Sequence, residues 1–134
     1  MALKTGGSVW ACGYDNSYQL GTAEWKDQSI PTQVGNETDW AAVVAGYQHT
    51  VALKTNGELW CWGNNSYGQL AFEDTVHGSN PIRVGSDKDW VAVSAGEFHT
   101  IAIKGDGSIW AWGGNEYGEL GDGYGSPKVP VHIP

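Results

Sequence analysis

Basic residues are scarce in this sequence. It has only 7 Lys and Arg against 15 Asp and Glu, so its formal net charge is −8. Binding to a phosphate backbone depends on clustered Lys and Arg side chains, which this composition does not supply. We therefore expect no nucleic-acid partner.

Cysteine is also rare, and long apolar runs are missing. Cys12 and Cys61 cannot form the dense disulfide framework of a small secreted scaffold, and neither lies in a Cys-x-x-Cys or His-rich metal pattern. No apolar run approaches the ~20 residues needed to cross a bilayer, and residues 1–10 lack the regions of a secretory signal. We expect a soluble chain with no membrane partner, metal or cofactor, and its compartment stays open.

The residues that are abundant favour an all-β protein. The sequence contains 20 Gly, 8 Trp and 6 Tyr, and 40% of its residues are hydrophobic. Glycine is unfavourable inside helices, whereas aromatic residues separated by turn-forming ones suit short strands. The hydrophobic content is sufficient for a substantial core.

The sequence repeats itself every 50 residues without gaps, and seven of the eight Trp fall on repeat positions. We divide the chain into a truncated first repeat at 1–34, a second at 35–84 and a third at 85–134, all within one propeller domain. Structural positions that recur in every copy are Trp10, Trp60 and Trp110, and Gly13, Gly63 and Gly113.

Each full repeat holds four segments of strand character. In the second repeat these are 40–45, 49–54, 58–62 and a short last strand at 82–84 after a proline. Asn56-Gly57 between the second and third segments predicts a type I′ hairpin turn.

These strands are apolar on both faces. Trp60 and Trp62 point to one side of the sheet, while Leu59 and Cys61 point to the other. Sheets of this kind must be covered on both faces, and radial stacking of four-stranded antiparallel blades provides this cover. With 134 residues and a 50-residue repeat, we predict a β-propeller of about 2.7 blades per chain.

Residues 89–96, 99–104, 106–113 and 115–121 resemble the regulator of chromosome condensation repeat, in its bacterial form, and 60–70 carries its signature again. The resemblance implies a propeller whose complete form usually has about seven blades. Its members include an exchange factor for the small GTPase Ran, a plant ultraviolet-B photoreceptor and a secreted β-lactamase inhibitor. Because one fold hosts several functions, the resemblance alone does not select one.

Departures from the family pattern narrow the range of functions that we expect for this chain. The photoreceptor's Gly-Trp-Arg-His-Thr motif stands here as residues 46–50, with Tyr47 and Gln48 in place of Trp and Arg. A light sensor is therefore not expected. In the first copy, Cys12 stands where Trp62 and Trp112 stand, which predicts that this blade packs differently.

Fewer than three blades leave apolar faces and strand edges uncovered. Two explanations remain open. The chain is a piece of a longer propeller, or several copies associate into a homo-oligomer that closes the ring.

No catalytic constellation is evident. His49 and His99 occupy the same repeat position, so we interpret them as copies of one structural hydrogen-bonding element. The glycine-rich segment 121–125 has neither a following helix nor the spacing of a phosphate or calcium loop. We interpret three carboxylate pairs as solvated loop charges, with Asp39 and Asp89 also capping turns: Glu37 with Asp39, Glu73 with Asp74, and Asp87 with Asp89. The sequence predicts that the chain is not an enzyme.

The best functional clue is where the repeats differ. Segments 35–70 and 85–120 share 19 of 36 residues, whereas 21–30 and 71–80 share one of ten. Divergent residues on exposed loops of a rigid scaffold are favoured interface anchors, although drift in unconstrained loops would give the same pattern. The candidate partner-binding residues are Trp25, Tyr47, Gln48, Phe72, Glu97 and Phe98.

We expect a non-enzymatic β-propeller scaffold that recognises a protein partner through its loops. The alternatives are a propeller that regulates guanine-nucleotide exchange on a GTPase, and a purely structural repeat module of a larger surface or secreted protein.

Overall fold

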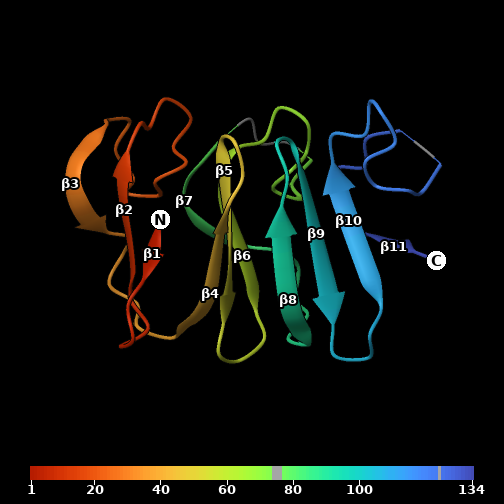
Figure 1. Cartoon of the computed structure of the whole chain (residues 1–134), viewed down its shortest axis with the longest axis horizontal. Helices are drawn as coiled ribbons and strands as arrows, with labels where there is room; N and C mark the ends of the chain where they lie inside the picture. Colours follow the sequence, from red (N-terminus) through yellow and green to blue (C-terminus); the bar gives the residue numbers. More distant parts are fainter. Residues whose placement is uncertain (74–76, 124) are drawn as a thin grey trace.

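The computed structural model describes residues 1–73, 77–123 and 125–134, and within them it forms three antiparallel sheets that stand face to face along the long axis (Figure 1). The first sheet consists of β1 (Ala2–Leu3), β2 (Val9–Gly13) and β3 (Gln28–Gln33). The second consists of β4 (Trp40–Ala45), β5 (His49–Lys54), β6 (Leu59–Asn64) and β7 (His77–Arg83). The third consists of β8 (Trp90–Ala95), β9 (His99–Lys104), β10 (Ile109–Gly113) and β11 (Val131–Ile133). The prediction of all-β blades is confirmed, and the described residues include no helix able to cross a bilayer.

The last strand of the second sheet is longer than the expected 82–84. β7 spans His77–Arg83 and contains Pro81 in its interior. β7 pairs with β6 alone at the outer edge of the sheet, where a proline does not interrupt a ladder on its free side. The register of the pairing between β6 and β7 shifts between Cys61 and Gly63, and this irregularity accommodates the unequal number of residues on the two strands.

The hairpin between β5 and β6 is not the type I′ turn predicted from Asn56-Gly57. Gly57 has a φ of 83°, but Asn56 is not in the left-handed region. The Gly57 N–H donates to the Lys54 carbonyl at 3.0 Å, and the Lys54 N–H donates to the Glu58 carbonyl at 3.0 Å. This is a three-residue loop closed by one left-handed glycine, so the turn needs only one residue of that conformation.

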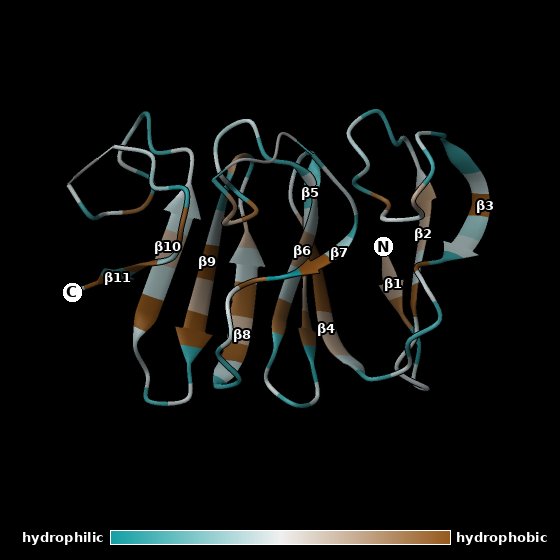
Figure 2. Cartoon of the chain, turned by 180° about the vertical axis from the view of Figure 1, so that it is seen from behind, coloured by the Kyte–Doolittle hydropathy of each residue, from teal (hydrophilic) through white to brown (hydrophobic). Residues whose placement is uncertain are grey.

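Two hydrophobic clusters fill the spaces between the sheets. Leu59 and Cys61 are fully buried against the third sheet, in a cluster that contains Trp90 and Trp112. Trp62 is fully buried on the opposite face of the same strand, in a cluster with residues of the first sheet. Figure 2 shows apolar residues along β4, β6 and β9, and mostly hydrophilic residues in the hairpin turns at the lower edge. The prediction that both faces of β6 are covered is therefore confirmed.

Hydrogen bonds between blades repeat with the sequence. The carbonyl of Gln19 in the first blade accepts the Trp62 indole N–H at 3.1 Å and the Thr50 hydroxyl at 2.8 Å, both from the second blade. One repeat later, the carbonyl of Gln69 accepts Trp112 and Thr100, each at 2.9 Å. At both interfaces, one carbonyl of the earlier blade thus accepts two side-chain donors from the next blade.

His49 adds a buried contact to the second of these interfaces. Its Nε2 lies 3.1 Å from the hydroxyl of Thr100, which already donates to Gln69. The Thr100 oxygen therefore accepts the Nε2–H of a neutral imidazole. Burial, with a smaller contribution from the charge of His99, lowers the pKa of His49 to about 4, so the ring is neutral at physiological pH.

Candidate partner-binding surface

The turns that join β4 to β5 and β8 to β9, and the loops that follow β2, β6 and β10, lie along one edge of the molecule, the upper edge in Figure 1. The turn at 96–98 joins β8 to β9, and the loop at 114–119 follows β10. A hydrogen bond of 2.7 Å from the Gly114 N–H to the Phe98 carbonyl holds the two segments together. We call this edge the loop face.

Aromatic rings gather on the loop face around Phe98. The ring centroid of Tyr67, from the second blade, lies 4.7 Å from that of Phe98 in a tilted stack. Tyr47 meets Phe98 edge to face at 6.1 Å. Tyr47 is 66% exposed and Tyr117, on the neighbouring loop, is 90% exposed.

Beside this cluster is a cleft of about 400 Å³, which we call the aromatic cleft. Its aromatic walls are Tyr67, Phe98 and Tyr117, and its carboxylates are Glu97, Glu116 and Glu119. His99 and Gly114 complete the lining, and no Lys or Arg is among these described residues. The cleft therefore combines flat apolar surface with negative charge.

Glu119 holds a fixed charge within the aromatic cleft. Its carboxylate accepts the Tyr117 N–H at 3.0 Å. Hydrogen bonds from the backbone N–H groups of Glu119 and Tyr117 lower the pKa of this carboxyl, so it stays ionised well below neutral pH. The same contact positions Tyr117, because it closes the turn that carries that residue.

The regulator of chromosome condensation (RCC1) repeat matches residues 6–53, 56–103 and 106–134, and a second form of the same repeat matches 40–69 and 90–119. The chain belongs to the RCC1 repeat family. The segments 6–53 and 56–103 each start near a hairpin turn in one blade and end in the second strand of the next, so the RCC1 sequence repeat straddles two blades. No curated protein sequence matches the chain.

Solved RCC1-like structures show the same arrangement of blades. Human WBSCR16 superposes with a TM-score of 0.84 at 24% identity, covering 98% of this chain and 34% of its own. Prp20p from Saccharomyces cerevisiae gives 0.88 at 19%, covering 99% and 35%. Yeast RCC1 (Prp20) bound to Kap60 gives 0.80 at 18%, covering 95% and 32%. This RCC1-repeat chain thus spans about a third of the length of those proteins and has their propeller fold.

The structure brings together only some of the residues selected from RCC1-repeat divergence. Tyr47, Glu97 and Phe98 lie at or beside the aromatic cleft. Gln48 is not among the residues that line it, and its side-chain oxygen accepts the Asn64 amide N–H at 3.4 Å. Phe72 packs against the core between the second and third blades.

Trp25 lies apart, in the first blade. It is 65% exposed, and its indole N–H donates to the Asn16 carbonyl at 3.0 Å. It lines a separate hollow with Tyr14 and Asp27, among others.

Sequence reasoning missed four aromatic and acidic side chains of the cleft: Tyr67, Glu116, Tyr117 and Glu119. The two tyrosines lie in the RCC1 signature, where recurrence suggested a structural role. The two glutamates could have been found from the sequence, because Glu116 and Glu119 replace the neutral Ser66 and Gln69 of the preceding repeat.

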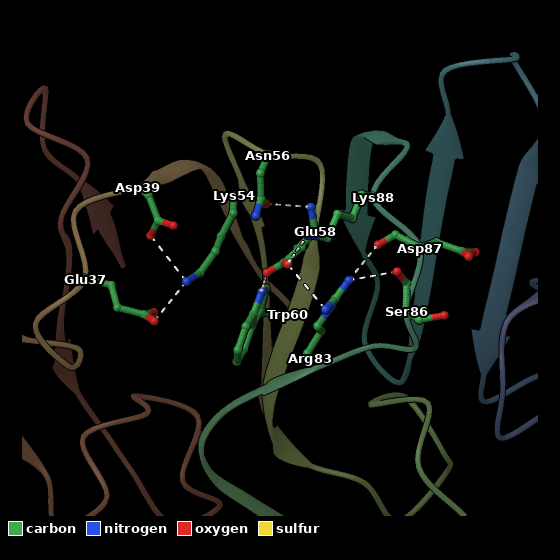
Figure 3. Close-up of polar contacts among 10 residues, drawn as sticks. All are labelled: Glu37, Asp39, Lys54, Asn56, Glu58, Trp60, Arg83, Ser86, Asp87 and Lys88. Atoms are coloured by element: carbon green, nitrogen blue, oxygen red, sulfur yellow. Dashed lines mark hydrogen bonds and ion pairs between the residues drawn. The ribbon is translucent and has the colours of Figure 1, made fainter.

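The carboxylate pairs are not simply solvated loop charges. Lys54 lies between Glu37 at 2.9 Å and Asp39 at 3.3 Å, as Figure 3 shows, and its ammonium also lies over the rings of Trp40 and Trp60 at 5.0 and 4.7 Å. Lys104 repeats this arrangement one blade on, with Asp87 and Asp89. These carboxylates therefore help to hold a lysine over two indoles.

A second ionic group in Figure 3 surrounds Glu58, whose carboxylate lies 3.3 Å from Arg83 and 3.5 Å from Lys88. Within residues 1–73, 77–123 and 125–134, no group of three or more His, Cys, Asp and Glu could hold a metal ion. Asp74, of the pair Glu73 with Asp74, and Tyr124, of the glycine-rich segment, lie outside the described residues.

Proposed function

We propose that this chain is a non-enzymatic part of an RCC1-type propeller that recognises a protein partner through the aromatic cleft and the adjoining Tyr47. The observation that carries the proposal is the set of exposed and half-buried aromatic rings gathered around Phe98. Aromatic side chains bury large areas while losing few rotamers, and they dominate the binding energy of protein interfaces.

The loops that carry these rings are held in place by their own hydrogen bonds. The Leu120 N–H donates to the Asn115 side chain at 3.0 Å, and the corresponding bond from Leu70 to Asn65 is 2.8 Å. The Asn64 N–H donates to the Gln48 carbonyl at 2.8 Å. A preorganised surface of this kind loses less entropy on binding than mobile loops would.

The structural neighbours support a protein as the class of partner. Prp20p is a protein whose binding to Gsp1p and histones has been studied, and yeast RCC1 has been solved bound to Kap60. These are partners of those proteins, which are 18–19% identical to this chain.

The guanine-nucleotide exchange alternative is supported by the shared fold alone. A nucleotide-release assay with purified small GTPases checks it, and stimulated release by this chain would establish it. The alternative of a purely structural module predicts no loop-face partner at all.

We propose separately that further blades complete the propeller ring. These blades come either from the same polypeptide or from further copies of this chain. Light scattering at several concentrations separates them. A mass of 14.4 kDa that is independent of concentration would contradict closure by copies.

The loop-face proposal is tested by photo-crosslinking. We would place a benzoylphenylalanine at Tyr117 on the loop face and, as a matched control, at Thr55 in a hairpin turn on the opposite edge, and irradiate each in cell extract. A protein captured by the Tyr117 probe, absent with the Thr55 probe and lost when Tyr47 and Phe98 are both replaced by Ala, supports the proposal. Equal capture at both positions, or capture that survives the double substitution, contradicts it.

A further inference from the structure

We propose that the aromatic cleft binds the guanidinium group of an arginine side chain on the partner protein. This inference rests on the proposed function and names the chemistry that the partner must present. It follows from the charge of the cleft, from a comparison of neighbouring blades and from the geometry of its aromatic rings.

The charge of the cleft selects a cation. Glu97, Glu116 and Glu119 lie around one opening of about 400 Å³, a size within the usual range of ligand pockets. No Lys or Arg is among the lining residues that the structure describes, and the chain as a whole has a net charge of −8. An anionic or purely apolar group would leave these carboxylates without a counterion when it excluded water.

The neighbouring blade shows that the fold does not require this charge. At the positions of Glu97, Glu116 and Glu119, the second blade carries Tyr47, Ser66 and Gln69, all of which are neutral. The local geometry is nevertheless the same. Gln69 accepts the Tyr67 N–H at 3.0 Å, just as Glu119 accepts the Tyr117 N–H at 3.0 Å. The carboxylates are therefore a property of this cleft and not of blade construction.

The rings favour arginine over lysine. A guanidinium group is planar, stacks on aromatic faces and pairs with carboxylates through two parallel hydrogen bonds, whereas an ammonium is a more strongly hydrated point charge. The cleft offers both features together, since Tyr67 and Phe98 form a tilted stack at 4.7 Å and three carboxylates lie around them. Cation–π contacts with exposed rings add to the attraction.

The test uses the full chain, labelled with ¹⁵N, and a short peptide, acetyl-Gly-Arg-Gly-Arg-Gly-amide. Two matched peptides carry lysine or citrulline at the arginine positions, and citrulline has nearly the same shape without the charge. We expect saturable chemical-shift changes at residues 67, 97–99 and 114–119, the tightest binding for the arginine peptide and the weakest for citrulline. Equal binding of the citrulline peptide, or shifts centred elsewhere, would overturn the inference.

Variants that copy the second blade separate specific binding from general attraction to an acidic protein. Glu119→Gln and Glu116→Ser should each weaken arginine-peptide binding about two- to fivefold, the range for exposed ion pairs, and together about tenfold. Glu24→Gln, at an exposed carboxylate of the first blade, removes the same charge outside the cleft and should leave affinity within about 1.5-fold. An equal loss with Glu24→Gln would contradict the site.

The two proposals fail in different ways. If the Tyr117 probe still captures a partner while no arginine peptide binds the cleft, the arginine inference is wrong and the protein-recognition proposal stands. If peptide binding is specific but no protein is captured on the loop face, the cleft has the proposed chemistry and the protein-recognition proposal fails.

Discussion

Replacing Gly57 with Ala tests whether the blades are locked together through their hairpin turns. Gly57 has a φ of 83°, and a Cβ added there would overlap the Lys88 carbonyl oxygen and lie 2.7 Å from the Lys88 carbonyl carbon, in the segment that leads into the next blade. Gly107 closes the corresponding turn of the third blade with a φ of 86°, and its Cβ would meet nothing within 4 Å. Both substitutions place an alanine in left-handed backbone, but only Gly57→Ala also brings its Cβ against the backbone of another segment.

The magnitude follows from those two contributions. An Ala in the left-handed region costs about 1–2 kcal/mol at either position. At Gly57 the clash is with backbone that cannot rotate away, so the turn must move, at about 1–3 kcal/mol for overpacking. That movement also weakens the hydrogen bond of 3.3 Å from the Trp90 N–H to the Gly57 carbonyl, worth about 1 kcal/mol. We expect Gly57→Ala to lower the unfolding free energy by about 3–6 kcal/mol and Gly107→Ala by about 1–2 kcal/mol.

Urea unfolding followed by tryptophan fluorescence at pH 7 measures the difference. The two variants should unfold with similar m-values, so that midpoints can be compared directly. A third variant, Gly7→Ala, repeats the clash at the first interface, where the added Cβ would lie 2.8 Å from the Thr38 carbonyl carbon, and should behave like Gly57→Ala. The reasoning is refuted if Gly57→Ala and Gly107→Ala destabilise the chain equally, within about 0.5 kcal/mol.

Two further predictions concern the buried contact between the second and third blades. Because burial, and to a lesser extent the charge of His99, lowers the pKa of His49 to about 4 from about 6.5 unfolded, the unfolded chain binds more protons between these values. Stability is then fully present above pH 6.5 and should fall by about 3 kcal/mol as the pH drops to 4; urea unfolding across this range should give a flatter profile for His49→Gln. Thr100→Val removes a hydrogen bond to Gln69 and the acceptor for buried His49, so it should cost about 2–4 kcal/mol, whereas Thr50→Val removes one hydrogen bond and should cost about 1 kcal/mol. Equal losses of unfolding free energy in the two valine variants would contradict the assigned role of His49.

The sequence was sufficient to predict the blades because their packing depends on side chains. Trp60 and Trp62 alternate with Leu59 and Cys61, and the structure buries the two sets in separate clusters on opposite faces. β7 was harder to place because an outer strand contacts its own sheet on one side only, which leaves its sequence weakly constrained. The hydrogen bonds that the Gln19 and Gln69 carbonyls accept from the next blade could not be predicted from the sequence either, since every residue carries a backbone acceptor.

The candidate site was predictable only in part, for a related reason. Tyr47 and Phe98 differ from their counterparts in the neighbouring repeat, and this difference identified them. Tyr67 and Tyr117 recur at one repeat position, and recurrence suggested a structural role, yet Tyr117 is 90% exposed. Their approach to Phe98 depends on how one blade docks on the next, which no local pattern encodes.

The direction of the hydrogen bonds between blades bears on how the ring is completed. The indoles of Trp62 and Trp112 donate to the preceding blade, and Cys12 stands at that position in the first blade. A thiol is too short and too weak a donor to replace an indole that spans the interface. If a second copy docked its third blade against this first blade, the Glu119 carbonyl would lack the indole donor that Gln19 and Gln69 receive. The interface on that side therefore needs different contacts, which favours blades of different sequence over a ring of identical copies.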